Sequence, residues 1–370
     1  MKNKYSVILA VCFFSFLVFL FADQGQNPQW KGTIEEEDGI KIIKNPKEPL
    51  FGEITFELEE DLTIGNKEDE NYMFYRVRDI EVDKQGNIFV ADMSNQRIQK
   101  FDKYGKYVRT IGRKGQGPGE FERPWKVRVR NNGDLYVADA SFNIEVFDSD
   151  GNPRKTVKSE KSIRDFRLSE EGSFIGIFHK LSDLEMITSI CKANAQGEIV
   201  ETYAEFPSNY YIKRDSGDTI SGHTSGYEKE LMISKINDQS FVFGYSEDYE
   251  LWVVNDKGKL LYKIKKEAFP KKLPSRLKEF NLGKYQPYFF LILSDSKGRI
   301  YVQINKTWNE DVKEKEIDVF CKDGFYIYKT SLPKNTYVIR DGYLYALEVK
   351  DDELIKRFKI KNWDQIKTGI

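Results

Sequence analysis

Residues 79–101 read DIEVDKQGNIFVADMSNQRIQKF, and residues 126–147 read KVRVRNNGDLYVADASFNIEVF. The two stretches follow one pattern, because four positions of the first recur 47 residues later: Gly86, Val90, Ala91 and Asp92 return as Gly133, Val137, Ala138 and Asp139. A repeat of about 40–50 residues that holds four short strands is typical of one blade of a β-propeller. The repeat therefore predicts the architecture. The activity stays open, because a propeller is a scaffold that can carry different functional loops.

Glycine turns predict the number of blades. Apolar and polar residues alternate with a period of two through most of the chain, which is typical of strands. Within each repeat, one tight turn follows the first strand and another follows the third. The turns after first strands are expected at Gly86, Gly133, Gly172, Asn237-Asp238, Gly298 and Gly342, and those after third strands at Gly105, Gly151, Gly197, Gly258 and Gly324. Six turns of one kind and five of the other predict six blades, one of which lacks its own outer strand.

The missing strand is expected near the N-terminus. Gly65 precedes Val82 by 17 residues, as Gly112 precedes Val129, so residues 53–65 have the register of an outer strand with no blade before it. The last blade, residues 337–360, has three clear strands, and pairing with residues 53–64 would remove two exposed sheet edges. Residues 361–370 could supply a competing fourth strand, but they lack the preceding glycine turn. We therefore expect an all-β, six-bladed propeller of four-stranded antiparallel blades, closed by an N-terminal outer strand.

Residues 1–22 are typical of an export signal. Lys2 and Lys4 precede an apolar run from Val7 to Ala22 that is short for a membrane span. Cleavage after Ala22 would leave an N-terminal extension at 23–52 and the propeller at 53–370. Two alternatives stay open, a lipoprotein signal that ends at Cys12 and an uncleaved membrane anchor. Each version places the propeller in the periplasm or at the cell surface.

Composition excludes several classes of protein. The 58 basic and 59 acidic residues nearly balance, so no overall charge attracts nucleic acid or anionic lipid. Two histidines cannot form a zinc site of three histidines. Cys191 and Cys321 fall near the ends of third strands in blades that are not neighbours, so we expect both thiols to be buried and unbonded. No metal or other cofactor is predicted.

Blades 1 and 2 resemble NHL repeats. The resemblance rests on GNIFVAD at 86–92, NQRI at 95–98 and GQGPGEF at 115–121, and it covers about residues 65–158. Later blades are degenerate, and residues 241–258 are similar to blades of bacterial exported six-bladed propellers. The resemblance implies a six-bladed, TolB-like ring over the mature chain. It implies no single activity, because NHL propellers include RNA binders, protein-binding sensor domains and an amidating lyase.

Two loops imitate known binding motifs. Residues 112–119 are glycine-rich like a phosphate-binding loop, but they continue into a strand instead of Gly-Lys-Ser/Thr and a helix, which favours a turn between blades. Residues 148–152 resemble the start of a calcium-binding loop, but the later ligands are missing, which favours a hairpin turn.

Three aspartates are candidates for a metal in the central channel. Lactonase-like propellers hold a central Ca²⁺ through Glu, Asn and Asp, and Asp79, Asp92 and Asp139 could serve in such a site. Their spacing does not single them out. Asp92 and Asp139 close second strands, where a carboxylate ordinarily accepts hydrogen bonds from turn N–H groups.

Loop length predicts where a ligand binds. The tight turns after first and third strands define a short-loop face. The opposite, long-loop face carries the connections between blades and those after second strands, including 112–124, 207–228 and 267–287. Aromatic residues and arginine are enriched in recognition surfaces. The candidate binding residues on the long-loop face are Arg97, Arg123, Trp125, His179, Tyr210, Tyr211, Arg214 and His223. For each of them the alternative is a residue that packs between blades.

These patterns favour an exported, monomeric binding, sensing or scaffold module over an enzyme. Its expected ligand is a protein, peptide or glycan in the periplasm or at the cell surface, and not nucleic acid. The basic segment 265–278 could meet an anionic partner, with a solvated loop as the alternative. A hydrolase or lyase with calcium in its channel is the alternative function.

Overall fold

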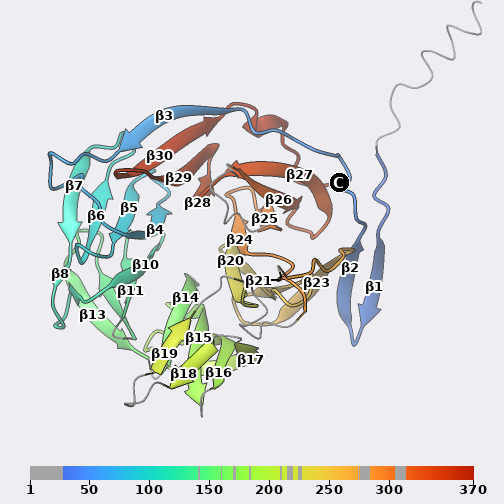
Figure 1. The fold of residues 1–370 in the computed structure, drawn as a ribbon, viewed down its shortest axis with the longest axis horizontal. Coiled ribbons are helices and arrows are strands. Elements are labelled where there is room, and N and C mark those ends of the chain that lie inside the picture. The colour runs from blue at the N-terminus through green and yellow to red at the C-terminus, as the bar shows by residue number, and fades with distance from the viewer. Residues whose placement is uncertain are drawn as a thin grey trace, which may run out of the picture.

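Six four-stranded antiparallel units are arranged in a ring, which confirms the predicted six-bladed propeller (Figure 1). The structure is a computed structural model. It describes residues 28–140, 142–159, 161–169, 172–182, 185–208, 211–214, 220–223, 227–273, 275, 284–304 and 314–370. The predicted export signal, Cys12 and Tyr210 lie outside these residues, as does most of segment 274–283.

The first three blades follow one another directly along the chain. In each of them the first strand is innermost and the fourth is outermost. Blade 1 contains β4 (Val77–Val82), β5 (Ile88–Asp92), β6 (Arg97–Phe101) and β7 (Tyr107–Ile111). Blade 2 contains β10 (Pro124–Val129), β11 (Leu135–Asp139), β12 (Asn143–Phe147) and β13 (Pro153–Lys158). Blade 3 contains β14 (Ser162–Leu168), β15 (Phe174–Ser182), β16 (Glu185–Ala193) and β17 (Ile199–Ser208).

The last three blades also use segments from the N-terminal part of the chain. Blade 4 contains β20 (Leu231–Asn237), β21 (Ser240–Tyr245), β22 (Glu250–Asn255) and β23 (Leu260–Lys266), and it is extended outward by β2 (Ile40–Asn45) and β1 (Thr33–Glu37). Blade 5 contains β24 (Leu291–Ser294), β25 (Ile300–Gln303), β26 (Glu314–Phe320) and β27 (Tyr326–Pro333). Blade 6 contains β28 (Thr336–Arg340), β29 (Tyr343–Val349), β30 (Glu353–Ile360) and β3 (Leu58–Ile64).

Two short two-stranded sheets lie between blades. β8 (Arg113–Lys114) pairs in parallel with β9 (Glu120–Phe121) between blades 1 and 2. β18 (Tyr211–Arg214) pairs with β19 (Ile220–His223) between blades 3 and 4. The glycine-rich loop is therefore a turn between blades, as expected. The Asp148 loop is a hairpin turn, because Asp148 Oδ1 accepts hydrogen bonds from the N–H groups of Asp150 and Asn152, both at 2.9 Å.

Apolar positions of the repeat pack between neighbouring blades. Phe89 and Ile98 of blade 1 contribute to the same buried cluster as Leu135 and Phe147 of blade 2. Alternate residues of a strand point to opposite faces of its sheet, so each blade presents an apolar face to both neighbours. The alternating apolar residues of the sequence therefore form buried cores between neighbouring blades around the ring.

The predicted ring closure is confirmed. β3 pairs antiparallel with β30, from Leu58 opposite Ile360 to Ile64 opposite Ile355. The pairing begins later than expected, because residues 50–54 contact blade 5 instead. The N–H groups of Leu50 and Phe51 donate to carbonyl oxygens of β27 at 3.0 and 2.9 Å.

The N-terminal segment is a belt around blades 4, 5 and 6, in that order (Figure 1). β2 adds in parallel to β23 of blade 4. Asn45, at the end of β2, links two blades: its side chain donates to the carbonyl oxygens of Gly324 at 2.9 Å and Lys265 at 3.2 Å. Its Oδ1 accepts a hydrogen bond from the N–H of Tyr326 at 2.8 Å.

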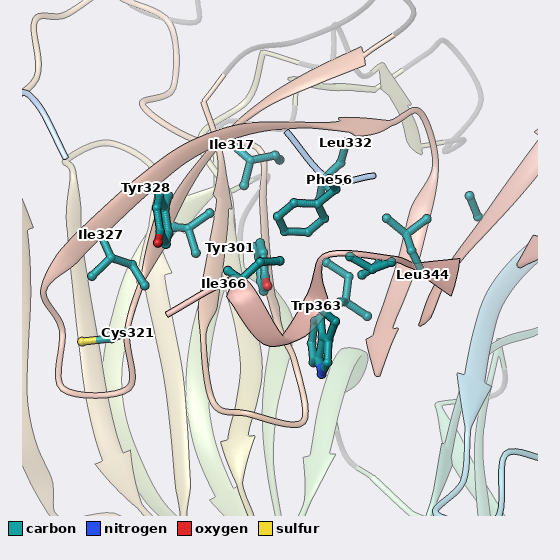
Figure 2. Close-up of a cluster of buried hydrophobic side chains, with 14 residues drawn as sticks. Phe56, Tyr301, Ile317, Cys321, Ile327, Tyr328, Leu332, Leu344, Trp363 and Ile366 are labelled. Carbon is teal, nitrogen blue, oxygen red and sulfur yellow. The ribbon is translucent and has the colours of Figure 1, made fainter. Parts of the chain in front are cut away.

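The two ends of the described chain share one core between blades 5 and 6. Figure 2 shows Phe56 from the belt near Ile317 and Leu332 of blade 5, and Trp363 and Ile366 from the C-terminal segment beside the same cluster. Residues 361–370 do not form the competing strand. They contain a 3₁₀ turn, η2 (Trp363–Gln365), held by the fully buried Arg299. Its guanidinium lies 4.0 Å from the Trp363 ring centre and donates to the Ile366 carbonyl oxygen at 2.8 Å.

Both cysteines of the described chain are buried and unbonded, as predicted. Cys191 lies in β16 of blade 3, and Cys321 directly follows β26 of blade 5. Blade 4 separates them, which agrees with the blade assignment made from the glycine turns.

Candidate functional site

The inner strands of all six blades enclose a central channel with a volume of about 940 Å³. β4, β10, β14, β20, β24 and β28 supply most of its lining. The wall differs from one side of the ring to the other. Charged side chains dominate the wall of blades 1 to 3, and apolar side chains dominate the middle of the wall of blades 4 to 6.

Arg128 is the centre of the charged wall. Its guanidinium lies 2.5 Å from Asp79, 2.7 Å from Asp165 and 3.5 Å from Glu81, which come from blades 1 and 3. Burial tends to raise the pKa of Asp165, but Arg167, Lys126 and Arg128 hold that pKa well below its usual range. Burial raises the pKa of Glu81. The buried charges are therefore paired, as a low-dielectric environment requires.

Four arginines join neighbouring inner strands. An inner strand is a sheet edge, so some of its carbonyl oxygens have no strand partner. Arg128 donates to Phe166 O at 3.0 Å, Arg130 to Ser169 O at 2.6 Å, Arg167 to Ile233 O at 2.8 Å and Arg340 to Val82 O at 2.9 Å. These bonds link blade 2 to 3, blade 3 to 4 and blade 6 to 1. These bonds hold the inner strands in place around the channel. The belt holds the outer strands of blades 4 to 6 in place.

The opposite wall is mostly uncharged. Met232, Leu291, Leu293 and Val338 line it and are half buried. Lys315, at the start of β26, lines the same wall. β26 begins after the connection from the second strand of blade 5, so Lys315 lies toward the long-loop face.

Asp238 spans the channel at the short-loop face. This residue lies in the turn after the first strand of blade 4, yet it contacts Lys84 of blade 1 at 3.4 Å and Asn131 of blade 2 at 3.3 Å. Lys235 adds a third contact at 2.8 Å. These contacts, with a hydrogen bond from Lys235 first among the causes, lower the pKa of Asp238 to about 2. A polar bridge therefore crosses this mouth of the channel.

The rim of blades 1 and 2 on the long-loop face is organised by two buried aspartates. Asp92 accepts hydrogen bonds from the Tyr75 N–H and the Arg97 guanidinium, both at 2.9 Å. Asp139 accepts from the Glu122 and Arg123 N–H groups at 3.1 and 2.6 Å. The expected turn-supporting role of both carboxylates is confirmed, and Asp79 pairs with Arg128.

The predicted binding residues of blades 1 to 3 differ in what their side chains contact. Arg123 is exposed. Arg97 bonds Asp92 and donates to the carbonyl oxygens of Glu70 and Met73, both at 2.7 Å, so it anchors a loop. Trp125 packs against the core of blades 2 and 3, although its buried Nε1 has no hydrogen-bond partner among the residues that the structure describes. His179 bonds Thr188 at 2.9 Å within blade 3.

The remaining predicted residues belong to the hairpin between blades 3 and 4. Tyr211 and His223 are opposite one another in β18 and β19, and Arg214 ends β18. The structure describes the backbone of this hairpin. Tyr210 lies outside the described residues. The hairpin brings Tyr211 and His223 together, but it is separate from the rim of blades 1 and 2.

Sequence reasoning missed the channel residues Arg128 and Lys315 and the rim residues Tyr75 and Phe142. Tyr75 is 54% exposed and Phe142 is 49% exposed. One signal was available for the channel: the first strands read DIEVD, KVRVR and RDFR, with charges at alternating positions of strands that a propeller buries. Charged residues at such positions indicate a polar channel.

No group of three or more His, Cys, Asp or Glu residues that could hold a metal occurs in the described part of the chain. No helix within the same residues is long and apolar enough to cross a membrane.

Comparison with known proteins agrees with this architecture. Residues 68–221 match the model of the DUF5128 family, described as a 6-bladed beta-propeller. The human E3 ubiquitin-protein ligase TRIM32 is 28% identical over 148 residues, and the Drosophila melanogaster protein brain tumor is 36% identical over 75 residues. The chain is a six-bladed β-propeller with NHL-type repeats.

These relatives are matched over part of their length. The matched region covers 40% of the propeller chain and 21% of TRIM32, and 20% of the chain and 7% of brain tumor. The Caenorhabditis elegans protein pgal-1, described as a probable peptidyl-alpha-hydroxyglycine alpha-amidating lyase, is 26% identical over 138 residues, which are 36% of the chain and 38% of pgal-1. The chain therefore spans well under half of each of these relatives.

Two solved structures share the fold over most of their length. A Bacteroides fragilis protein described as exported has a TM-score of 0.58 and 16% identity, with 86% of this chain and 99% of that chain covered. A member of the duf4221 family from Bacteroides vulgatus has a TM-score of 0.51 and 14% identity, with 82% and 98% covered. At these identities the likeness concerns the fold alone.

Proposed function

We propose that the propeller is an exported, non-catalytic binding or sensing module whose ligand enters the central channel from the long-loop face. The observation that carries this proposal is a channel of about 940 Å³ with an ionic wall and an apolar wall. Small-molecule and peptide-side-chain sites commonly have volumes of about 300–1,000 Å³ and combine apolar surface with a few polar groups. The bridge at Asp238 favours entry from the long-loop face.

Two further observations support the proposal. Export agrees with the apolar run at residues 7–22 and with the description of the Bacteroides fragilis protein that shares the fold. Exposed Tyr75, Arg123 and Phe142 on the rim suit recognition of a peptide or glycan part that stays outside the channel. We expect the propeller to act as a monomer.

A thermal-shift screen of residues 23–370 tests the proposal. The panel contains N-acetylated dipeptides, oligosaccharides and medium-chain carboxylic acids. A ligand at about 100 times its Kd should stabilise the native state by about 2.7 kcal/mol, which is a rise of several degrees in Tm. Leu291→Trp and Val338→Trp, which narrow the channel, should abolish this rise, whereas Asn132→Ala on the short-loop face should retain it. A rise that persists in both channel variants would place the site elsewhere.

The similarity to pgal-1 favours one second candidate, a lyase that uses a metal. The same thermal-shift measurement with Ca²⁺, and with a chelator added afterwards, separates the two functions. Reversible stabilisation by Ca²⁺ would favour the enzyme, because a bound metal stabilises the native state by mass action.

A further inference from the structure

Lys315 differs from the other cations of the channel. Among the described residues, nine lysine and arginine side chains line the channel. Eight of them contact a carboxylate or a carbonyl oxygen: Lys84, Lys126, Arg128, Arg130, Arg164, Arg167, Lys235 and Arg340. The side chain of Lys315 has no hydrogen bond or ion pair within the part of the chain that the structure describes.

The missing partner is significant because of the environment of the Lys315 side chain. The side chain is half buried, and burial alone lowers the pKa of its ammonium to about 8. Its β-sheet partner in β27 is the buried Leu332, which supplies no charge. An ammonium group that leaves water without a partner destabilises the folded state. Unpaired charges of this kind in a channel are typical of binding sites, where the ligand supplies the partner.

One more hydrogen-bond donor on the same side of the ring lacks a partner among the described residues. Ser294 Oγ in β24 is buried and makes no hydrogen bond within them, whereas Arg340 Nε in β28 lies 3.5 Å from Asp341 Oδ2. Both residues line the channel near the ends of their strands at the short-loop face. The apolar side chains of Leu291, Leu293 and Val338 lie between these two residues and the level of Lys315 along the channel.

We propose that the wall of blades 5 and 6 is a subsite for an amphiphilic carboxylate. The carboxylate pairs with Lys315 near the long-loop face, and the apolar body of the ligand packs against Leu291, Leu293 and Val338. A hydrogen-bond acceptor at the far end of the ligand would reach Ser294 Oγ. This assignment rests on the proposed channel-binding function and names the chemistry of its ligand.

Octanoate and 1-octanol are the probes, because they share an apolar chain and differ in charge. Isothermal titration calorimetry measures both with residues 23–370 and with Lys315→Met, which keeps the length of the side chain and removes its charge. We expect the variant to bind octanoate at least tenfold more weakly and 1-octanol equally well. Lys103→Met, at an exposed lysine of the short-loop face, should change neither affinity.

Thermal melting is a second measurement. It separates a lysine that serves binding from one that stabilises the fold, because only replacement of the former should raise Tm. Lys315→Met removes an unpaired charge, so its Tm without ligand should rise by about 2 °C at neutral pH. Equal octanoate affinity in parent and variant, with 1-octanol bound by both, would overturn the carboxylate subsite and leave channel binding in place. If the parent binds neither probe, both the carboxylate subsite and ligand binding in the channel are overturned.

Discussion

Arg128 connects three blades through its side chain. It is buried, and the carboxylates of Asp79 and Asp165 lie within 2.7 Å of its guanidinium. Without this cation, Glu81 would lose its ion pair, and Asp79 and Asp165 would keep only Lys126 and Arg167 as partners. Breaking a buried charge pair from one side is strongly destabilising because the remaining charge is uncompensated.

Arg128→Met should therefore lower the free energy of unfolding by about 3–5 kcal/mol. Arg154→Met is the matched control, since Arg154 pairs with Asp134 at 3.2 Å while being 55% exposed. Arg154→Met should lower the free energy of unfolding by less than about 1 kcal/mol. Urea denaturation at neutral pH measures both variants. Equal losses in the two would contradict the role assigned to Arg128.

His179 should make stability depend on pH. Burial, followed by the charge of Arg164, lowers the pKa of His179 to about 4 from its ordinary 6.5. Between these values the unfolded chain binds a proton that the folded chain does not, so the free energy of unfolding falls as pH falls from 6.5 toward 4. His179→Gln does not titrate and should lose less stability over this window. Parallel pH profiles for parent and variant in urea denaturation would contradict the assignment.

At the scale of whole elements, the N-terminal belt stabilises blades 4, 5 and 6. It supplies the fourth strand of blade 6 and extends blade 4, and residues 50–54 bond the outer strand of blade 5. Removal of β3 would expose the edge of β30. Removal of β1 and β2 alone would leave every blade with four strands.

Two truncations separate these contributions. A chain without residues 23–52 should still melt cooperatively, but at a lower Tm, because blade 6 stays closed. A chain without residues 23–65 should lose cooperative melting and solubility, since unpaired sheet edges promote association. Calorimetry and size-exclusion chromatography measure both. Sharp melting of the shorter chain at the parent's Tm would refute ring closure by β3.

At the scale of the whole molecule, we propose that the long-loop face is the functional surface. Phe142 on this face is 49% exposed and has φ of +64°, a backbone conformation that an aromatic residue rarely adopts. Strain of this kind is often retained where a side chain serves binding. Arg123 lies beside the same turn through Asp139.

Phe142→Gly should raise the free energy of unfolding by up to about 1 kcal/mol, because glycine adopts positive φ without strain. The same variant combined with Arg123→Ala should weaken capture of a ligand found in the thermal-shift screen. Lys103→Ala and Asn132→Ala, on the short-loop face, should leave capture unchanged. Loss of capture from the short-loop set alone would reverse the assignment of the two faces.

The sequence by itself determined the blade count, the strand order and the closure of the ring by a strand that precedes Gly65. These follow from local rules: a turn glycine sets where each hairpin reverses, and the period of two sets which side chains are buried. The repeat pattern also predicted the supporting roles of Asp92 and Asp139, and each carboxylate accepts hydrogen bonds from backbone N–H groups 16 or 17 residues earlier in the chain. Unbonded Cys191 and Cys321 followed from the blade assignment alone.

Only the tertiary structure decided which charges meet. Arg128 and Asp165 are 37 residues apart, Asp238 reaches Lys84 from across the ring, and Asn45 bonds Gly324 from the far end of the chain. No local pattern specifies such pairs, because they depend on how six blades are placed around one axis. For the same reason Arg97 and Trp125, which the sequence suggested for binding, are held by loop and core contacts, whereas the Lys315 side chain lines the channel without a partner among the described residues.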